Sequence, residues 1–194
     1  DETFADLDKP FACVATDLAS GREVWLREGR ILDAVRASVA LPGLLVPQLL
    51  DGRYLVDGGL VNPVPVSLCR ALGADIVIAV DLSMDTIGLR QRRGDASAPA
   101  PAWRQTMGRW LGREGDGDGE DVARPSLADV VSNSIAIMQG RISRSRLAGE
   151  PADVLIAPRL GQLGLLDFHR AHEAIAAGRT AAEHMLPMLR AIIE

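Results

Sequence analysis

Cysteines, aromatic residues and long apolar runs are all scarce in this sequence of 194 residues. Two cysteines, Cys13 and Cys69, are too few for a disulfide framework or a cysteine-based metal site, and they favour a reducing compartment. No apolar run reaches the ~18 residues that a membrane-spanning helix needs. The sequence therefore predicts neither a disulfide-stabilised fold nor a transmembrane protein, and the cytoplasm is the favoured location.

An excess of positive charge is also missing, because 26 acidic residues outnumber 21 basic ones and the net charge is −5. A nucleic-acid-binding domain needs clustered Lys and Arg to contact phosphates, so we expect no nucleic-acid partner. By contrast, 47% of the residues are hydrophobic, and a chain of this length can bury a core without disulfides or metals. The length suits one domain.

The first residues hold neither a methionine nor the basic and apolar stretches of a secretory signal. We therefore expect the chain to be a piece of a longer protein.

Strand and helix patterns alternate between residues 11 and 80. Apolar spacing and turn residues predict strands at 11–18, 22–26, 53–56 and 76–80, a helix at 31–40, and a helix capped by Asn62 and ended by Gly73. The stretch 44–50, which contains Pro47, is predicted to be an irregular connector. Strand, helix and strand within 53–80 predict a βαβ unit, hence a parallel sheet. The unbroken apolar run at 76–80 is typical of a strand buried on both faces.

The composition changes between residues 84 and 125, where basic, Pro/Ala-rich and Gly/acidic stretches follow one another. This segment is predicted to be a flexible insertion or lid. Beyond it, the pattern predicts a helix at 126–147 with Val130, Val131 and Met138 among its inward residues, and a buried strand at 153–157. A last helix begins at Asp167, and Pro187 is expected to break or kink it.

Asp57 is the strongest candidate for chemistry. We expect it at the carboxyl end of a parallel strand, where open α/β sheets place their ligands, before two glycines that permit unusual backbone angles. The helix opening at Asn62 would help to keep the carboxylate ionised. A general base needs a nucleophile within hydrogen-bond reach, and the alternative for Asp57 is a plain strand-to-helix turn.

No serine of this chain has the G-x-S-x-G elbow that exposes a nucleophile in α/β hydrolases. Ser38 is at best a supporting residue, and Ser67 and Cys69 fall inside an apolar helix, which predicts Cys69 to be a small core residue. No glycine-rich run suits an oxyanion hole or a phosphate group.

Three further polar residues are weaker candidates. His169 and His172 share a helix face beside Glu173, a spacing that can hold a metal, but a third ligand is lacking and surface histidines are the favoured interpretation. Asp81 follows the strand predicted at 76–80, so the argument that makes Asp57 a candidate for chemistry applies to it more weakly. The alternative is that Asp81 stabilises a turn or caps a helix. We expect no cofactor and no metal.

The segments 37–43, 51–65 and 72–81, in that order, resemble the carboxyl-terminal half of bacterial patatin-like phospholipases. Residues 152–158 and the stretch from Asp167 to Gly178 are similar to the end of that family's domain. The resemblance implies a three-layer α/β/α fold with a mainly parallel sheet, here lacking its amino-terminal part. Residues 1–194 would form the carboxyl-terminal portion of a single hydrolase domain with an insertion at about 84–125.

The same resemblance implies a serine lipid acyl hydrolase that uses a Ser-Asp dyad and no catalytic histidine. Asp57 in the Asp57-Gly58-Gly59 motif would activate the serine. The family's oxyanion loop and serine elbow lie upstream of the similar region, so this chain carries only the aspartate and is expected to be inactive alone. The implied partners are a lipid or other acyl ester and the missing amino-terminal segment.

Two other functions stay open. A patatin-like module without a nucleophile would bind or regulate rather than catalyse, and a nucleotide-binding α/β domain would need a phosphate loop that is not in the sequence. The apolar, proline-punctuated stretch 41–50 is expected either to line an acyl site or touch a membrane surface, or to pack as a connector.

Overall fold

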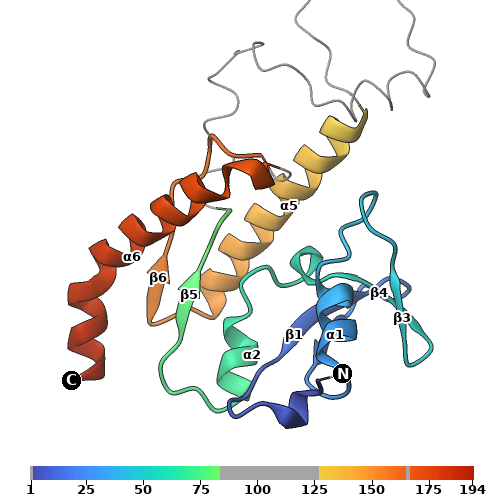
Figure 1. Ribbon diagram of the computed structural model, residues 1–194, viewed down its shortest axis with the longest axis horizontal. Helices are drawn as coiled ribbons and strands as arrows, with labels where there is room; N and C mark the ends of the chain where they lie inside the picture. The colour runs from blue at the N-terminus through green and yellow to red at the C-terminus, as the bar shows by residue number, and fades with distance from the viewer. Residues whose placement is uncertain (1, 84–126, 165–166) are drawn as a thin grey trace, which may run out of the picture.

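The computed structural model describes residues 2–83, 127–164 and 167–194 (Figure 1). The predicted insertion at 84–125 lies outside these residues. The described elements form a four-stranded sheet near the amino terminus and a two-stranded sheet farther along the chain. Helices α5 (Leu127–Gly149) and α6 (Ala171–Ile193) accompany the smaller sheet (Figure 1).

The larger sheet is built from two hairpins. Its strands are β1 (Cys13–Asp17), β2 (Glu23–Leu26), β3 (Gln48–Leu50) and β4 (Arg53–Asp57), in the order β2-β1-β4-β3. All three pairings are antiparallel. The predicted strand at 22–26 is therefore confirmed, and it pairs with β1 as a hairpin.

The turn between β3 and β4 explains their register. Asp51 and Gly52 have φ of 48° and 73°, the two left-handed residues that a two-residue hairpin loop needs. The segment 44–50, predicted to be an irregular connector, is not irregular throughout, because its last three residues form β3. Pro47 directly precedes this edge strand, a place where proline breaks no ladder bond.

The predicted βαβ unit over 53–80 is wrong. Strand β4 pairs with β1 on one side and β3 on the other, so neither edge is free for β5 (Ile78–Val80). Strand β5 pairs in parallel with β6 (Val154–Ile156) instead. The α/β fold class is confirmed, and the parallel pairing that it predicted lies in this smaller sheet.

Helix α2 (Val66–Ala71) connects the two sheets and starts later than the sequence predicted. Its N-cap position is Pro65, and Asn62 does not cap it. Asn62 is buried and donates to Glu23 across the fold, a contact between distant residues that local spacing cannot reveal. Gly73 has a φ of 93°, which confirms it as the left-handed residue after the helix.

Helix α1 (Ile31–Ser38) covers the larger sheet, with Ala34 and Ala37 buried. One core cluster comprises Ala15, Ala37 and Leu55, and a second comprises Val64, Val66, Val77 and Ala79. The first cluster joins α1 to β1 and β4, and the second joins α2 to β5. These contacts hold the end of β4, and with it Asp57, between well-packed elements.

The long helices differ from their predicted patterns. In α5, Ile135 is buried, but Val130, Val131 and Met138 are exposed rather than inward. Helix α6 follows a short 3-10 turn (Phe168–Arg170), and no side-chain cap bond from Asp167 opens that turn. Pro187 lies inside α6 without ending it. The exposed Pro187 removes a donor where the carbonyls can bond to water.

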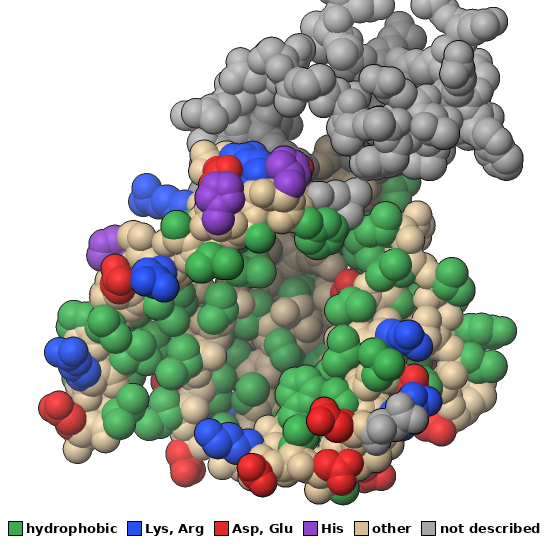
Figure 2. Space-filling model, in the orientation of Figure 1, with side chains coloured by type: hydrophobic (Ala, Val, Ile, Leu, Met, Phe, Trp, Pro, Cys, Tyr) green, Lys and Arg blue, Asp and Glu red, His purple; other side chains and the backbone are tan. Residues whose placement is uncertain are grey.

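The smaller sheet exposes apolar side chains. Ile78 and Val80 of β5 are 47% and 52% exposed, so the prediction of a strand buried on both faces is wrong among the described residues. Figure 2 shows hydrophobic side chains gathered on the face that carries α6 and the β5–β6 pair. In the described part of the chain, no helix is long and apolar enough to cross a bilayer.

Candidate active site

The backbone of Asp57 is fixed from two sides. Its N–H donates to the carbonyl of Ala40 at 3.0 Å, and its carbonyl accepts from Thr16 Oγ1 at 2.8 Å. Ala40 follows α1, and Thr16 lies in the neighbouring strand β1. These contacts place Asp57 at the end of β4, where the chain turns into the short 3-10 helix Gly58–Leu60.

The carboxylate of Asp57 caps that short helix. Its Oδ1 accepts a hydrogen bond from the N–H of Gly59 at 2.5 Å. Burial raises the pKa of Asp57, and the Gly59 N–H offsets only part of that rise. A half-buried carboxylate whose pKa is raised is a better proton acceptor than a surface aspartate, which suits a general base.

Glycine is required at positions 58 and 59 because a side chain would clash with neighbouring atoms, not because the backbone angles are unusual. Neither has a left-handed φ, so the expectation of unusual angles is wrong. A Cβ on Gly58 would clash with the backbone carbonyl of Val14. A Cβ on Gly59 would lie 2.8 Å from Asp57 Oδ1 and clash with the side-chain amide of Gln139. The motif therefore lets β1 and α5 approach the carboxylate closely.

Two sequence arguments for Asp57 are corrected by this geometry. Its strand is antiparallel to both neighbours, so Asp57 does not end a parallel strand. The helix that was to stabilise its charge begins at Val66, not at Asn62. The group that does stabilise the charge of Asp57 is the N–H of Gly59, which belongs to the same motif. The residue spacing in the sequence does not identify it as a donor.

Asp81, the weaker candidate, is 1% exposed and lies just beyond β5. It accepts from the N–H and Oγ of Ser83 at 2.8 and 2.6 Å, and from Ser143 Oγ at 2.7 Å. The contacts with Ser83 confirm the turn interpretation. The contact with Ser143, which ties α5 to β5, was not predicted, because 62 residues separate the partners.

Among the described residues, the candidate nucleophiles Ser67 and Cys69 make no hydrogen bond with Asp57. Ser67 Oγ accepts from the Asn62 amide at 3.3 Å, and no serine in the described ranges donates to the Asp57 carboxylate. Cys69 is exposed, so its assignment to the core is wrong: it faces away from the apolar side of the short helix α2.

His169 and His172 lie on the surface, as predicted. Glu173 beside them forms an ion pair with Arg170, with 2.6 Å between Nη2 and Oε2. The hydrogen bond from Arg170 lowers the pKa of Glu173, and this effect is larger than the opposing effect of burial. Across the described residues, no three His, Cys, Asp or Glu side chains gather as a metal site would require.

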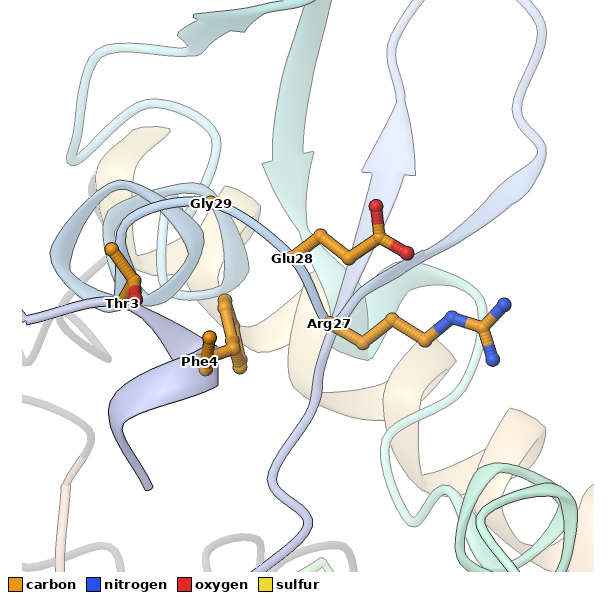
Figure 3. A pocket seen from close by; sticks show the side chains of 6 residues that line it. Thr3, Phe4, Arg27, Glu28 and Gly29 are labelled. Carbon is orange, nitrogen blue, oxygen red and sulfur yellow. The ribbon is translucent and has the colours of Figure 1, made fainter.

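A hollow of about 430 Å³ lies near the amino terminus, away from Asp57 (Figure 3). It is lined by Thr3, Phe4, Ala5, Arg27, Glu28 and Gly29. The charged ends of Arg27 and Glu28 point away from Phe4 rather than toward a common centre (Figure 3). The hollow therefore lacks the converging polar groups of a small-molecule site.

Comparison with known proteins shows what the sequence around this site is similar to. Residues 1–70, which include Asp57 and both glycines, match the family model described as patatin-like phospholipase. An uncharacterized NTE family protein of Mycobacterium tuberculosis is 31% identical, over 91% of this chain and 62% of the relative. Lysophospholipase NTE1 of Chaetomium globosum is 27% identical, over 93% of this chain and 11% of that protein.

A second uncharacterized NTE family protein of M. tuberculosis is 29% identical over 93% of this chain and 29% of the relative. The chain thus spans less than two thirds of the length of these relatives. The family match covers the candidate site, and the relatives cover most of the chain. The chain is thus similar to patatin-like phospholipases over residues 1–70 and to NTE family proteins over most of its length.

Proposed function

We propose that this chain carries the general base of a serine-dependent lipid acyl hydrolase, and that Asp57 is that base. The observation that supports it most is the half-buried Asp57 carboxylate, held by the Gly59 N–H within the segment that matches the family. The serine and the oxyanion donors are proposed to come from a segment outside this chain.

In this mechanism Asp57 takes the proton of the serine hydroxyl as the serine oxygen attacks the ester carbonyl. Collapse of the tetrahedral intermediate breaks the bond to the alcohol, which receives the proton from Asp57. The acyl-serine is then hydrolysed by a water that Asp57 deprotonates in the same way, releasing the fatty acid. No cofactor is needed for these steps.

The test is fatty-acid release from lysophosphatidylcholine and phosphatidylcholine vesicles by the full natural polypeptide that contains this sequence. We expect Asp57→Asn to lower the rate by ~100-fold or more, because general base catalysis contributes about that much. Asp75→Asn, the same change at an exposed site, should leave the rate unaltered. Equal rates for Asp57→Asn and the parent would contradict the proposal.

The alternative, a binding module without catalysis, gives a different result in the same assay. Such a protein would bind the vesicles and release no fatty acid in either form. Binding without hydrolysis by the full polypeptide would therefore replace the hydrolase proposal with a lipid-binding one.

The loop before β3 supports a contact with the lipid surface. Leu44, Leu45 and Val46 are 50%, 49% and 77% exposed in a row, close along the chain to the strand that pairs with β4. Exposed apolar residues in series are typical of interaction sites. We expect Val46→Asp to weaken vesicle binding several-fold in a flotation assay, while Ile193→Asp, an equally apolar change at the end of α6, does not.

A further inference from the structure

Gln139 of α5 lies over the turn that holds Asp57. Its side-chain nitrogen Nε2 and Asp57 Oδ1 crowd the same point beside the Cα of Gly59. The Gln139 side chain is half-buried, and among the described residues its amide makes no hydrogen bond. An amide donor without a partner therefore lies next to the candidate base.

Helix α5 is fastened in this position by two polar contacts farther along the same face. One turn after Gln139, the fully buried Ser143 donates to Asp81 at 2.7 Å. Arg146 then donates to Glu23 of β2 at 2.7 Å. Residues at i, i+4 and i+7 share a helix face, so these anchors fix how Gln139 is presented to the turn.

Charged groups do not compete for the Asp57 carboxylate. The ionisable residues of the described elements packed around it are Cys13 and Asp17 of β1, Arg53 and Tyr54 of β4, Asp33 and Arg36 of α1, and Arg141, Arg144 and Arg146 in the described part of α5. None of them contributes to the shift in the pKa of Asp57, which comes from burial and from Gly59. Arg53 acts instead on Asp17.

We propose that Gln139 is a positioning residue for Asp57: its side-chain amide donates a hydrogen bond to carboxylate oxygen Oδ2, the one that Gly59 does not hold. The inference rests on the proposed function, which gives Asp57 a role as base. Making the bond requires a rotation of the Gln139 side chain, whose Nε2 already lies beside the same point as Asp57 Oδ1.

The bond would hold the carboxylate in one orientation and favour its ionised form. The test follows the carboxyl carbon of Asp57 by NMR in the ¹³C-labelled chain, with the resonance assigned by its loss in Asp57→Asn. We expect Gln139→Met, which keeps the volume and removes the donor, to raise the pKa of Asp57 by about 0.5 to 1. Gln162→Met, the same change at an exposed site, should leave it unaltered.

A second variant tests proximity independently. Gln139→Glu places a carboxylate where the amide was, so we expect a larger rise in the pKa of Asp57 and a two-step titration of the pair. In the active full polypeptide, the acid limb of the kcat/KM profile should move to higher pH in Gln139→Met by the same amount.

Unchanged Asp57 titration in Gln139→Met and Gln139→Glu, with both variants folded as judged by melting temperature, would overturn the inference. That result would leave the hydrolase proposal intact. Conversely, full activity of Asp57→Asn would overturn the hydrolase proposal while the NMR titration still reported whether Gln139 and Asp57 interact.

Discussion

At the residue scale, Asp57 and its two glycines act as one unit. The carboxylate is half-buried because Gly58 lets the turn press against Val14 of β1, and because Gly59 leaves room for Gln139. The same glycines would be tolerated in any turn, so the sequence alone cannot distinguish close packing from backbone freedom. The structure shows that close packing is what this motif requires.

Gly58→Ala should therefore destabilise the fold by at least ~2 kcal/mol, because its methyl group would overlap a strand carbonyl that cannot move without breaking the sheet. Urea unfolding monitored by circular dichroism measures the change. Gly178→Ala is the matched control: it adds the same methyl group in open space within α6 and should stabilise by ~0.5–1 kcal/mol. Equal effects of the two variants would contradict the steric account.

The raised pKa of Asp57 also predicts that the free energy of unfolding depends on pH. Because the folded protein binds the proton more tightly than the unfolded chain, the stability gained is complete below the unfolded pKa, near 3.8, and is lost as the pH rises through the folded value. Asp57→Asn keeps an acceptor for Gly59 and removes the charge. We expect it to be more stable than the parent at neutral pH.

That difference in stability should shrink to nothing in acid, when Asp57 is protonated in both states of the parent. Urea unfolding of the two proteins across this pH range measures it. A constant difference at every pH would mean that Asp57 has an ordinary pKa in the folded protein.

At the element scale, α5 is the connection that local patterns do not reveal. Its predicted apolar face included Val130, Val131 and Met138, yet these are exposed. The side that packs inward instead carries Gln139, Ser143 and Arg146, each meeting a residue far away in the sequence. Apolar periodicity identified the helix and its buried residue Ile135, but it could not identify the polar contacts on the same side.

Ser143→Ala should cost about 1–3 kcal/mol of stability, because it leaves the buried Asp81 carboxylate without one of its donors. Ser145→Ala, on the exposed side of the same helix, should cost nearly nothing. Chemical unfolding of both variants measures the difference, and indistinguishable midpoints would show that the contact with Asp81 does not fasten α5.

The hairpins, in contrast, follow from local signals. Asp51 and Gly52 specify a tight turn wherever they occur between strands, and the structure confirms it. Local signals also predicted, wrongly, that β4 and β5 lie in one parallel sheet. Strand pairing depends on which strand edges are free, and local signals do not show this. Strand β4 pairs with β3 in a hairpin and with the distant strand β1 on its other side, so both of its edges are occupied. This is a property of the sheet rather than of residues 53–80.

At the scale of the whole molecule, the α/β class and the likeness to patatin-like phospholipases could be inferred from ordered short motifs, and the match to the family model over residues 1–70 agrees. Short motifs could not reveal that Asp57 lies in an antiparallel sheet or that Gln139 lies beside it. Both features depend on packing between residues far apart in the sequence. The catalytic role of Asp57 is a proposal, and it depends on a serine that we propose to lie outside this chain.

The most direct test of that role is the rate at which a fluorophosphonate labels the serine of the full polypeptide, compared between the parent and Asp57→Asn. Labelling reports activation of the nucleophile itself and does not depend on which lipid is the substrate. If Asp57 is the base, the substitution slows labelling by ~100-fold or more at neutral pH. Labelling of Asp57→Asn at the parental rate would contradict the account.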